Sequence, residues 1–215
     1  MPQYAVRISS GGIELEGRLH FPDGEEMPIG GVAVCHPHPQ YGGDMNNNVV
    51  IEVVRALLDR GIAAMRFNFR GVGASQGSYG SGTQERMDAI AAVDAVANND
   101  LAPLKQVGLA GYSFGGGVAL GAAPEAPGLA ALAVVSAAGE DDPDVEGLAK
   151  LTMPKLLVTG DADSFATVEK IEELAGLMPA PTETEVYPRT DHFWWGSEQQ
   201  MAERVARFFR ASFEP

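Results

Sequence analysis

Apolar and polar side chains alternate along the first part of the chain, up to residue 21. This period of two is typical of a strand with one face in the core and the other in water. After the segment SSGG, every second residue is apolar or glycine, namely Ile13, Leu15, Gly17, Leu19 and Phe21. The pattern predicts an N-terminal antiparallel hairpin that turns at SSGG.

Beyond residue 30, short apolar runs replace the alternation: GVAVC, GIAAMRF, VGLAGY, LAALAVVSA and KLLVTG. Such runs are typical of strands that are buried on both faces of a parallel sheet. Between them, apolar residues recur at intervals of three and four, which predicts helices over 49–58, 87–93, 168–178 and 197–213. Strands that alternate with helices form right-handed βαβ units. We therefore interpret residues 1–215 as one α/β domain, with a mostly parallel sheet, helices on both faces and the hairpin at one edge.

The segment GYSFGG, residues 111–116, carries the strongest chemical signal. It follows an apolar strand and precedes a helix of small residues, a context in which GxSxG makes a sharp turn that exposes the serine hydroxyl. Larger side chains at Gly111 and Gly115 would clash in that turn. The backbone N–H of Phe114 would face the substrate oxygen at the positive end of the following helix. Ser113 is the candidate nucleophile; the alternative is a Gly-rich turn that contains a serine by chance.

A nucleophilic serine needs a base, and the base needs a carboxylate that orients it. In this kind of site the chain order is Ser, acid, His, and His192 is the one histidine that follows Ser113. The acid should follow the strand KLLVTG, where Asp161 and Asp163 lie. We favour Asp163 because it can reach across the loop, whereas Asp161 fits the cap of a turn or helix. Asp191 adjoins His192 too closely to meet its ring from behind.

The loop VAVCHPHPQYGGD, residues 32–44, follows the first buried strand and matches the loop that supplies a second oxyanion donor. Its two prolines have no N–H, so the backbone donor between them is His38. Gln40 and Tyr41 are the next candidates and would contact the substrate. The sequence thus predicts an oxyanion hole formed by Phe114 and His38.

A second interpretation of the same loop is a metal site. His36 and His38 have the His-x-His spacing of some zinc sites, and Asp44, Asp191 and His192 could complete the set. Prolines on both sides of His38 favour a shaped loop instead, with His36 holding it by hydrogen bonds. We therefore predict neither a metal nor a cofactor, and keep a metal-dependent hydrolase and a catalytically silent binding protein as alternatives.

Charge excludes some classes of partner. The formal net charge is −14, which repels phosphate backbones and anionic lipid headgroups, so neither nucleic acid nor membrane is expected as a partner. The longest apolar stretch is shorter than the ~20 residues that span a bilayer. The start of the chain lacks a basic segment followed by an apolar run, and the single cysteine allows no internal disulfide. A cytoplasmic protein, monomeric or homodimeric, is the resulting expectation.

Five motifs stand in order along the chain: HPHP, NFRGVGASQG, GYSFGG, GDAD and DHF. With them the chain resembles the α/β-hydrolase superfamily over nearly its whole length, and within it small lidless bacterial serine hydrolases related to dienelactone hydrolase. The resemblance implies an eight-stranded, mostly parallel sheet and hydrolysis of carboxylic esters without a cofactor. It assigns Ser113, Asp163 and His192 to catalysis, with Phe114 and the HPHP loop as oxyanion donors. Dienelactone hydrolase itself uses cysteine, so its particular substrate is not implied here.

The chain leaves little room for a domain over the site. About 15 residues separate the end of the strand expected near residue 138 from the start of the next near residue 153. α/β-Hydrolases commonly carry a cap domain at this place. An open, shallow site without a cap suits esters or thioesters with short acyl groups as small-molecule substrates. Phe193 and Trp194, next to His192, are expected either to line the acyl pocket or to anchor the last helix.

Overall fold

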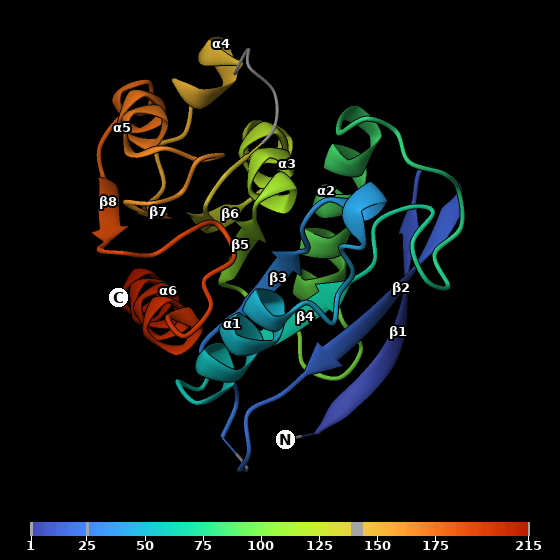
Figure 1. Ribbon diagram of the computed structural model, residues 1–215. Helices are drawn as coiled ribbons and strands as arrows, with labels where there is room; N and C mark the ends of the chain where they lie inside the picture. The colour runs from blue at the N-terminus through green and yellow to red at the C-terminus, as the bar shows by residue number, and fades with distance from the viewer. Residues whose placement is uncertain (1, 25, 139–143, 215) are drawn as a thin grey trace.

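The sheet of this chain has eight strands in the order β1-β2-β4-β3-β5-β6-β7-β8. A computed structural model describes residues 2–24, 26–138 and 144–214 (Figure 1). The strands are β1 (Gln3–Ser10), β2 (Ile13–His20), β3 (Gly31–Cys35), β4 (Ala63–Phe67), β5 (Val107–Tyr112), β6 (Leu129–Val135), β7 (Lys155–Gly160) and β8 (Thr182–Tyr187). The hairpin of β1 and β2 pairs antiparallel with β4, and the other strands are parallel. The predicted α/β-hydrolase architecture is confirmed.

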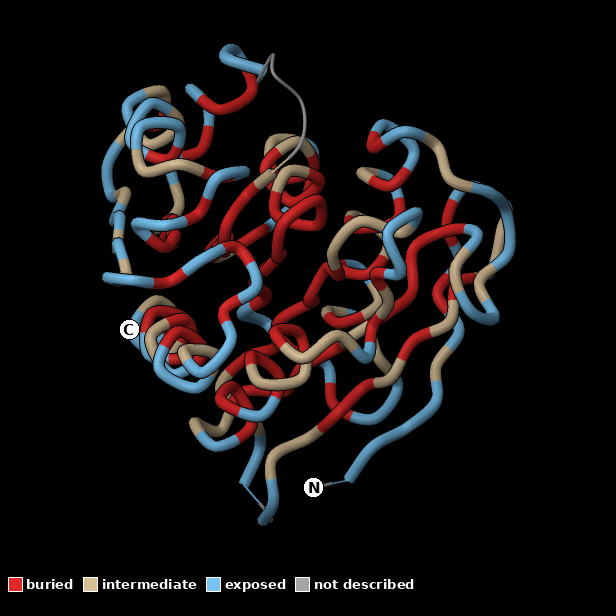
Figure 2. The backbone as a smooth tube through the Cα atoms, viewed as in Figure 1, coloured by how far each residue is buried: buried red, intermediate tan, exposed pale blue. Residues whose placement is uncertain are grey.

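Helices cover both faces of this sheet. They are α1 (Asn48–Leu58), α2 (Thr83–Ala97), α3 (Phe114–Ala122), α4 (Val145–Leu148), α5 (Val168–Gly176) and α6 (Glu198–Phe213), with 3-10 turns at Pro39–Tyr41 and Ala123–Glu125. One core cluster joins the sheet to α1 and α6, and the other joins its opposite face to α2, α3, α4 and α5. Figure 2 shows the buried backbone concentrated in the central strands between these layers.

The predicted elements differ from the observed ones mainly at their ends. Helix α2 begins at Thr83 and runs to Ala97, well beyond the periodic stretch 87–93, because small alanines extend its packed face. Helix α5 ends at Gly176, two residues earlier than expected. Between β6 and β7, the described residues contain the single-turn helix α4, which is too short to build a cap domain.

The order of the strands in the sheet indicates where a functional site should lie. From β3 the chain crosses to β4 on one side, and then returns through α2 to β5 on the other side of β3. Ligands of open α/β sheets bind where the strand order reverses in this way, outside the carboxyl ends of the strands. The loop after β3 and the turn after β5 therefore meet at the expected position of a site. Within the described residues, no helix is long and apolar enough to cross a membrane.

Candidate active site

Ser113 occupies the sharp turn between β5 and α3. Its backbone has φ 56° and ψ −124°, a conformation that non-glycine residues rarely adopt. Holding a residue there costs about 1–3 kcal/mol, and such strain persists only where the surroundings impose it. The turn aims the side chain away from the strand, at the carboxyl edge of the sheet.

The flanking glycines are required by close backbone contacts. A Cβ on Gly111 would lie 2.1 Å from the carbonyl oxygen of Gly115, and a Cβ on Gly115 would lie 2.5 Å from that of His36. Both distances are far shorter than any real contact of a Cβ atom. The start of α3 is therefore pressed against the end of β3, which brings the loop after β3 beside Ser113.

Three side chains from distant parts of the chain meet at this turn. His192 Nε2 lies 2.9 Å from Ser113 Oγ, and His192 Nδ1 lies 2.9 Å and 3.1 Å from the two carboxylate oxygens of Asp163. All three residues are buried. Because Nδ1 faces a carboxylate, it carries the ring proton, and Nε2 is left with a lone pair toward the serine hydroxyl. This is the geometry in which a histidine can remove the proton of a serine.

Asp163 is held in its ionised form. Burial opposes the charge, but hydrogen bonds from His192, the backbone N–H of Ala166 and the hydroxyl of Ser136 outweigh it, so the pKa of Asp163 lies below its usual value. The N–H of Phe165 donates to the same carboxylate at 2.9 Å. A carboxylate that accepts several hydrogen bonds remains charged at neutral pH and stabilises an imidazolium beside it.

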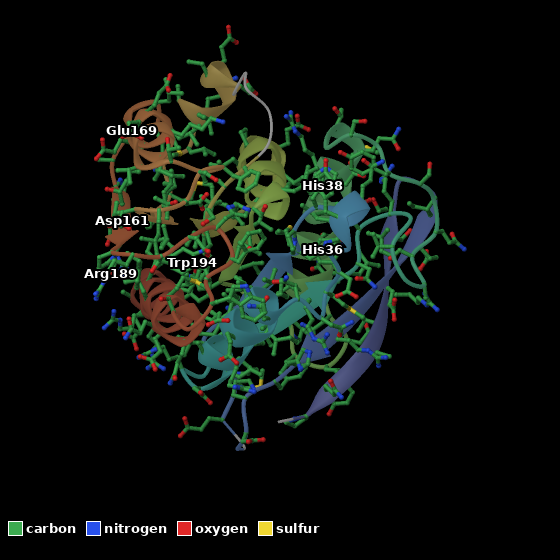
Figure 3. All side chains as sticks on the ribbon, in the orientation of Figure 1. His36, His38, Asp161, Glu169, Arg189 and Trp194 are labelled. Atoms are coloured by element: carbon green, nitrogen blue, oxygen red, sulfur yellow. The ribbon has the colours of Figure 1, made fainter. Side chains whose placement is uncertain are left out.

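The two neighbouring aspartates, Asp161 and Asp191, accept hydrogen bonds from backbone N–H groups instead. Asp161 is exposed and accepts a hydrogen bond from the backbone N–H of Arg189 at 2.6 Å, so it caps the loop that leads to His192. These two residues lie side by side in Figure 3. Asp191 accepts from the N–H of Phe193. Among the three candidates, the structure joins Asp163 to the histidine ring.

Trp194 does not line a substrate pocket. Its side chain has an exposed fraction of 0% and packs with α1 and α6 in the core, so the expected contact with an acyl group is wrong and the anchoring alternative holds. The indole N–H donates to Ser136 Oγ at 2.9 Å. Ser136 follows β6 with a positive φ of 46° and also donates to Asp163. Sequence reasoning missed Ser136, because nothing separates it from an ordinary residue at a strand end.

Aromatic residues surround the buried His192. The hydroxyl of Tyr112 donates to the carbonyl oxygen of His192 at 2.8 Å, which ties the histidine loop to the residue before the nucleophile. Phe165 lies 4.8 Å and Phe193 5.8 Å from the imidazole, measured between ring centroids. Phe193 is 53% exposed and stands beside the histidine.

Two free backbone donors lie near Ser113, one in the loop after β3 and the other at the start of α3. The N–H of Gln40 donates to His38 Nδ1, and the N–H of Tyr41 donates to the His38 carbonyl, so neither is available to a substrate. No acceptor in the described parts of the chain takes the N–H of His38 or Phe114. The rings of these two residues lie 4.8 Å apart. Both N–H groups are therefore free to donate to a bound group.

The histidines of the HPHP loop are engaged with protein groups. His36 Nδ1 lies 2.6 Å from the carbonyl of Pro37, and His36 Nε2 accepts the N–H of Phe69. His38 Nδ1 accepts from Gln40, and its Nε2 lies 3.2 Å from the Tyr79 hydroxyl. A metal ligand needs a free lone pair on a ring nitrogen. These bonds leave none, and the described ranges contain no group of three or more His, Cys, Asp or Glu placed to hold a metal.

A cavity of about 350 Å³ opens beside Phe114. Its walls come from the loop after β3, the start of α2, helix α3 and the region of α4 and α5. Apolar or small side chains make up much of the lining, among them Phe114, Gly117, Val118, Leu148 and Leu174. The side chains of Gln40, Tyr41 and Phe193, expected to contact substrate, are absent from this lining as far as the structure describes it. Tyr41 instead is 87% exposed.

Comparisons with known proteins identify the family and fold that the chain resembles. A family model described as an alpha/beta hydrolase domain matches residues 35–210. An uncharacterized protein of Rickettsia prowazekii is 34% identical over 181 residues, which cover 83% of this chain and 74% of the relative. An alpha-beta serine hydrolase homologue from Coxiella burnetii has a TM-score of 0.81 and 33% identity, over 96% of this chain and 97% of the other. A serine hydrolase without a lid from Xanthomonas campestris gives 0.82 and 27%, over 98% and 96%.

Proposed function

The chain belongs to the alpha/beta-hydrolase family, and from this we propose that it is a serine hydrolase that cleaves short-chain carboxylic esters or thioesters through an acyl-enzyme on Ser113. One observation carries the proposal. Ser113, His192 and Asp163 are joined by hydrogen bonds of 2.9 Å at each link. No movement of the loops is needed to assemble the three groups.

The chemistry follows from these contacts. Ser113 Oγ attacks the carbonyl carbon while its proton passes to His192 Nε2, and the carbonyl oxygen becomes an oxyanion. The N–H groups of His38 and Phe114 bind that oxyanion. When the intermediate collapses, the bond to the leaving alcohol or thiol breaks, and the leaving group takes the proton from His192. The charge of Asp163 stabilises the imidazolium throughout, without itself being protonated.

Water completes the cycle. A water molecule attacks the acyl carbon of the acyl-enzyme, and His192 Nε2 takes its proton. Collapse of the second intermediate returns the proton to Ser113 Oγ and releases the carboxylic acid. Atoms and charges balance without a cofactor, because the three side chains and two backbone donors supply each proton transfer and each stabilising contact.

The size of the site favours short acyl groups. The cavity beside Phe114 has about 350 Å³, near the lower end of the ~300–1,000 Å³ of small-molecule sites. The described residues between β6 and β7 build no cap domain that would shelter a long chain. We therefore expect turnover to be faster with acetyl to hexanoyl esters than with long-chain lipid esters.

The nucleophile is tested with a fluorophosphonate probe, which labels activated serines. The wild-type protein should be labelled and should hydrolyse p-nitrophenyl esters and acyl-CoA thioesters of short chain length. Ser113→Ala should lose both properties while keeping the same circular dichroism spectrum and unfolding temperature. Labelling that persists in Ser113→Ala would refute the assignment. A wild-type protein that is neither labelled nor active would support the catalytically silent alternative.

A further inference from the structure

The hydroxyl of Tyr79 stands at the junction of the oxyanion loop and the cavity. Its oxygen lies 3.2 Å from His38 Nε2, and its ring lies 5.3 Å from that of His38 and 5.9 Å from that of Phe114. Tyr79 also lines the cavity itself. It comes from the loop before α2, more than thirty residues away from the serine turn in sequence. No motif of the sequence singles it out.

The direction of the hydrogen bond between His38 and Tyr79 follows from the other side of the imidazole. The backbone N–H of Gln40 donates to His38 Nδ1 at 3.2 Å, so Nδ1 is an acceptor without a proton. The proton of the neutral ring is therefore on Nε2, and Nε2 donates to the oxygen of Tyr79. Burial lowers the pKa of His38 and outweighs the charge of Glu85, which acts in the opposite direction. Because the pKa is lowered, the ring is neutral at pH 7.

This bond leaves the proton of the Tyr79 hydroxyl without an acceptor among the described residues. Burial first, and then the charge of Glu85, raise the pKa of Tyr79, so the phenol remains protonated. Across the described ranges, His38 Nε2 is the one hydrogen-bond partner of the hydroxyl. A donor O–H thus stands in a cavity whose other walls include the apolar Phe114 and Val118. The charged side chains that also line the cavity are Arg86, Asp144, Lys170 and Glu173.

The loop that carries Tyr79 is fixed in place. Glu85 is fully buried, and its carboxylate accepts the backbone N–H of Gly80 and that of Gly82, each at 2.8 Å. It lies in the first turn of α2, where the helix dipole favours a negative charge. The backbone at Gly80 and Gly82, directly after Tyr79, is therefore held in place. The Tyr79 hydroxyl is thus preorganised rather than mobile.

In the proposed mechanism, the cavity falls on the acyl side of the reaction. The leaving group must receive a proton from His192, whose aromatic neighbours include Phe165 and Phe193. Within the described chain, none of these three residues belongs to the cavity lining. The cavity instead adjoins Phe114 and His38, which hold the carbonyl oxygen in the proposed mechanism. The remaining substituent of the carbonyl carbon, the acyl chain, is the part that enters the cavity.

We propose that Tyr79 is a specificity-determining residue whose hydroxyl donates a hydrogen bond to an oxygen on the acyl chain of the substrate. The preferred substrates are then esters of short acids that carry a ketone, ether or hydroxyl oxygen, over esters of plain alkyl acids. This proposal rests on the proposed serine hydrolysis, and it adds the chemical class of the acyl group.

The test compares p-nitrophenyl esters of 4-oxohexanoic, 5-oxohexanoic and hexanoic acid. Tyr79→Phe keeps the ring contacts and removes the hydroxyl. For one of the oxo esters, the ratio of its kcat/KM to that of the hexanoyl ester should fall about tenfold, the effect of one hydrogen bond of about 1.4 kcal/mol. Because Tyr79 also contacts His38, the substitution can lower kcat/KM for all the esters alike, and the ratio of two kcat/KM values cancels that shared loss. Equal losses on all three esters, or no loss, would overturn the proposal.

Tyr41→Phe is the matched control. Its ring also contacts His38, with 4.7 Å between centroids, but it does not belong to the cavity lining within the described chain. The ratio of oxo to plain ester should be unchanged in this variant. A fall as large as that of Tyr79→Phe would assign the effect to the loop rather than to the cavity.

A binding measurement separates this proposal from the proposed hydrolysis. In the Ser113→Ala background, calorimetry gives the affinities of 4-oxohexanoate, 5-oxohexanoate and hexanoate without turnover. Adding Tyr79→Phe should weaken one oxo acid about tenfold relative to hexanoate. That result would support the role of Tyr79 even if the wild-type protein hydrolysed no ester. If Tyr79→Phe left the affinity of each oxo acid relative to hexanoate unchanged, the role of Tyr79 would be refuted.

Discussion

The indole N–H of Trp194 donates to Ser136 Oγ at 2.9 Å, and this contact links the buried core to the candidate active site. Ser136 in turn donates a hydrogen bond to Asp163, the carboxylate that contacts His192. Trp194 is two residues from His192 in sequence, yet its ring lies in the core cluster shared with α6. The carboxylate is therefore positioned from two directions, by the histidine and by a serine that the core holds.

Ser136→Ala should lower kcat about tenfold and leave KM nearly unchanged. A hydrogen bond to a charged group contributes about 1.5–3 kcal/mol, and without it Asp163 is less well oriented toward the histidine. The same change leaves the buried indole N–H without an acceptor, which should reduce the free energy of unfolding by about 1–3 kcal/mol. Steady-state kinetics and urea unfolding measure the two effects.

Trp194→Phe is the control for that experiment. It removes the indole donor and leaves the hydroxyl of Ser136 in place to hold Asp163. Stability should fall through the lost packing and hydrogen bond, while kcat should fall less than in Ser136→Ala. If the two variants lost kcat equally, the role of Ser136 would be general packing of the core rather than positioning of the carboxylate.

The two aspartates of the GDAD turn should separate cleanly in kinetics. Asp163→Asn removes the charge that stabilises the imidazolium and fixes the ring tautomer, and should lower kcat about 10³–10⁴-fold. Asp161→Asn keeps an oxygen that can accept the N–H of Arg189, so kcat should stay within about twofold, as for most exposed substitutions. Comparable losses in both variants would contradict the assignment of the acid.

The serine turn could be predicted because part of its cause is local. Gly111 is demanded by a backbone contact with Gly115 inside the same turn, so the motif records that geometry, whereas the contact that demands Gly115 comes from the backbone of His36 in the loop after β3. The choice between the aspartates likewise depended on reach within one short turn. Trp194 could not be placed in this way: its positive φ of 62° turns it inward, while the adjacent Phe193 remains exposed.

The sequence also did not predict the roles of residues that depend on contacts between distant loops. Tyr79 meets His38 because the loop before α2 folds back over the end of β3, a path that no periodicity records. Gln40 and Tyr41 were expected as donors by their place in the loop, but the turn that shapes the loop uses their N–H groups. The sequence identifies local geometry and strand order, whereas tertiary contacts decide which donors remain free.

Gly43→Ala should disable the oxyanion loop. A Cβ at this position would lie 2.2 Å from the carbonyl oxygen of Pro37 and 2.8 Å from that of His38, so the loop would have to move. Loss of one oxyanion donor typically lowers turnover about 10²–10³-fold, and we expect kcat/KM of short esters to fall by that order. The variant is compared with Gly42→Ala, assayed under the same conditions.

Gly42 has a positive φ of 82°, but a Cβ added there would meet no described atom within 4 Å. Its alanine variant should therefore lose about 1–2 kcal/mol of stability from backbone strain and keep most of its activity. Thermal unfolding of both variants identifies any loss of activity that comes from unfolded protein. Equal activities in the two variants would show that the loop tolerates displacement and does not supply a donor.

The free energy of unfolding should fall as the pH is lowered from about 6.5 to about 4, because of His36. The ring is fully buried, and burial lowers its pKa to about 4, against the hydrogen bond to Pro37 and the charge of Asp44. An unfolded histidine titrates near 6.5, so between these values the unfolded chain binds more protons than the folded one. Stability then rises with pH through this window, by about 1.4 kcal/mol per unit for one group, and levels off above it.

His20 contributes in the same window, since burial and the charge of Arg66 lower its pKa to about 4 as well. Urea unfolding at several pH values between 4.5 and 7.5 should therefore show a slope of up to two protons in the wild-type protein. His36→Asn should be less stable at pH 7.5, because the N–H of Phe69 loses its acceptor, and its slope should be smaller by about one proton. A slope that His36→Asn leaves unchanged would mean that the imidazole at this position titrates as it does in the unfolded chain.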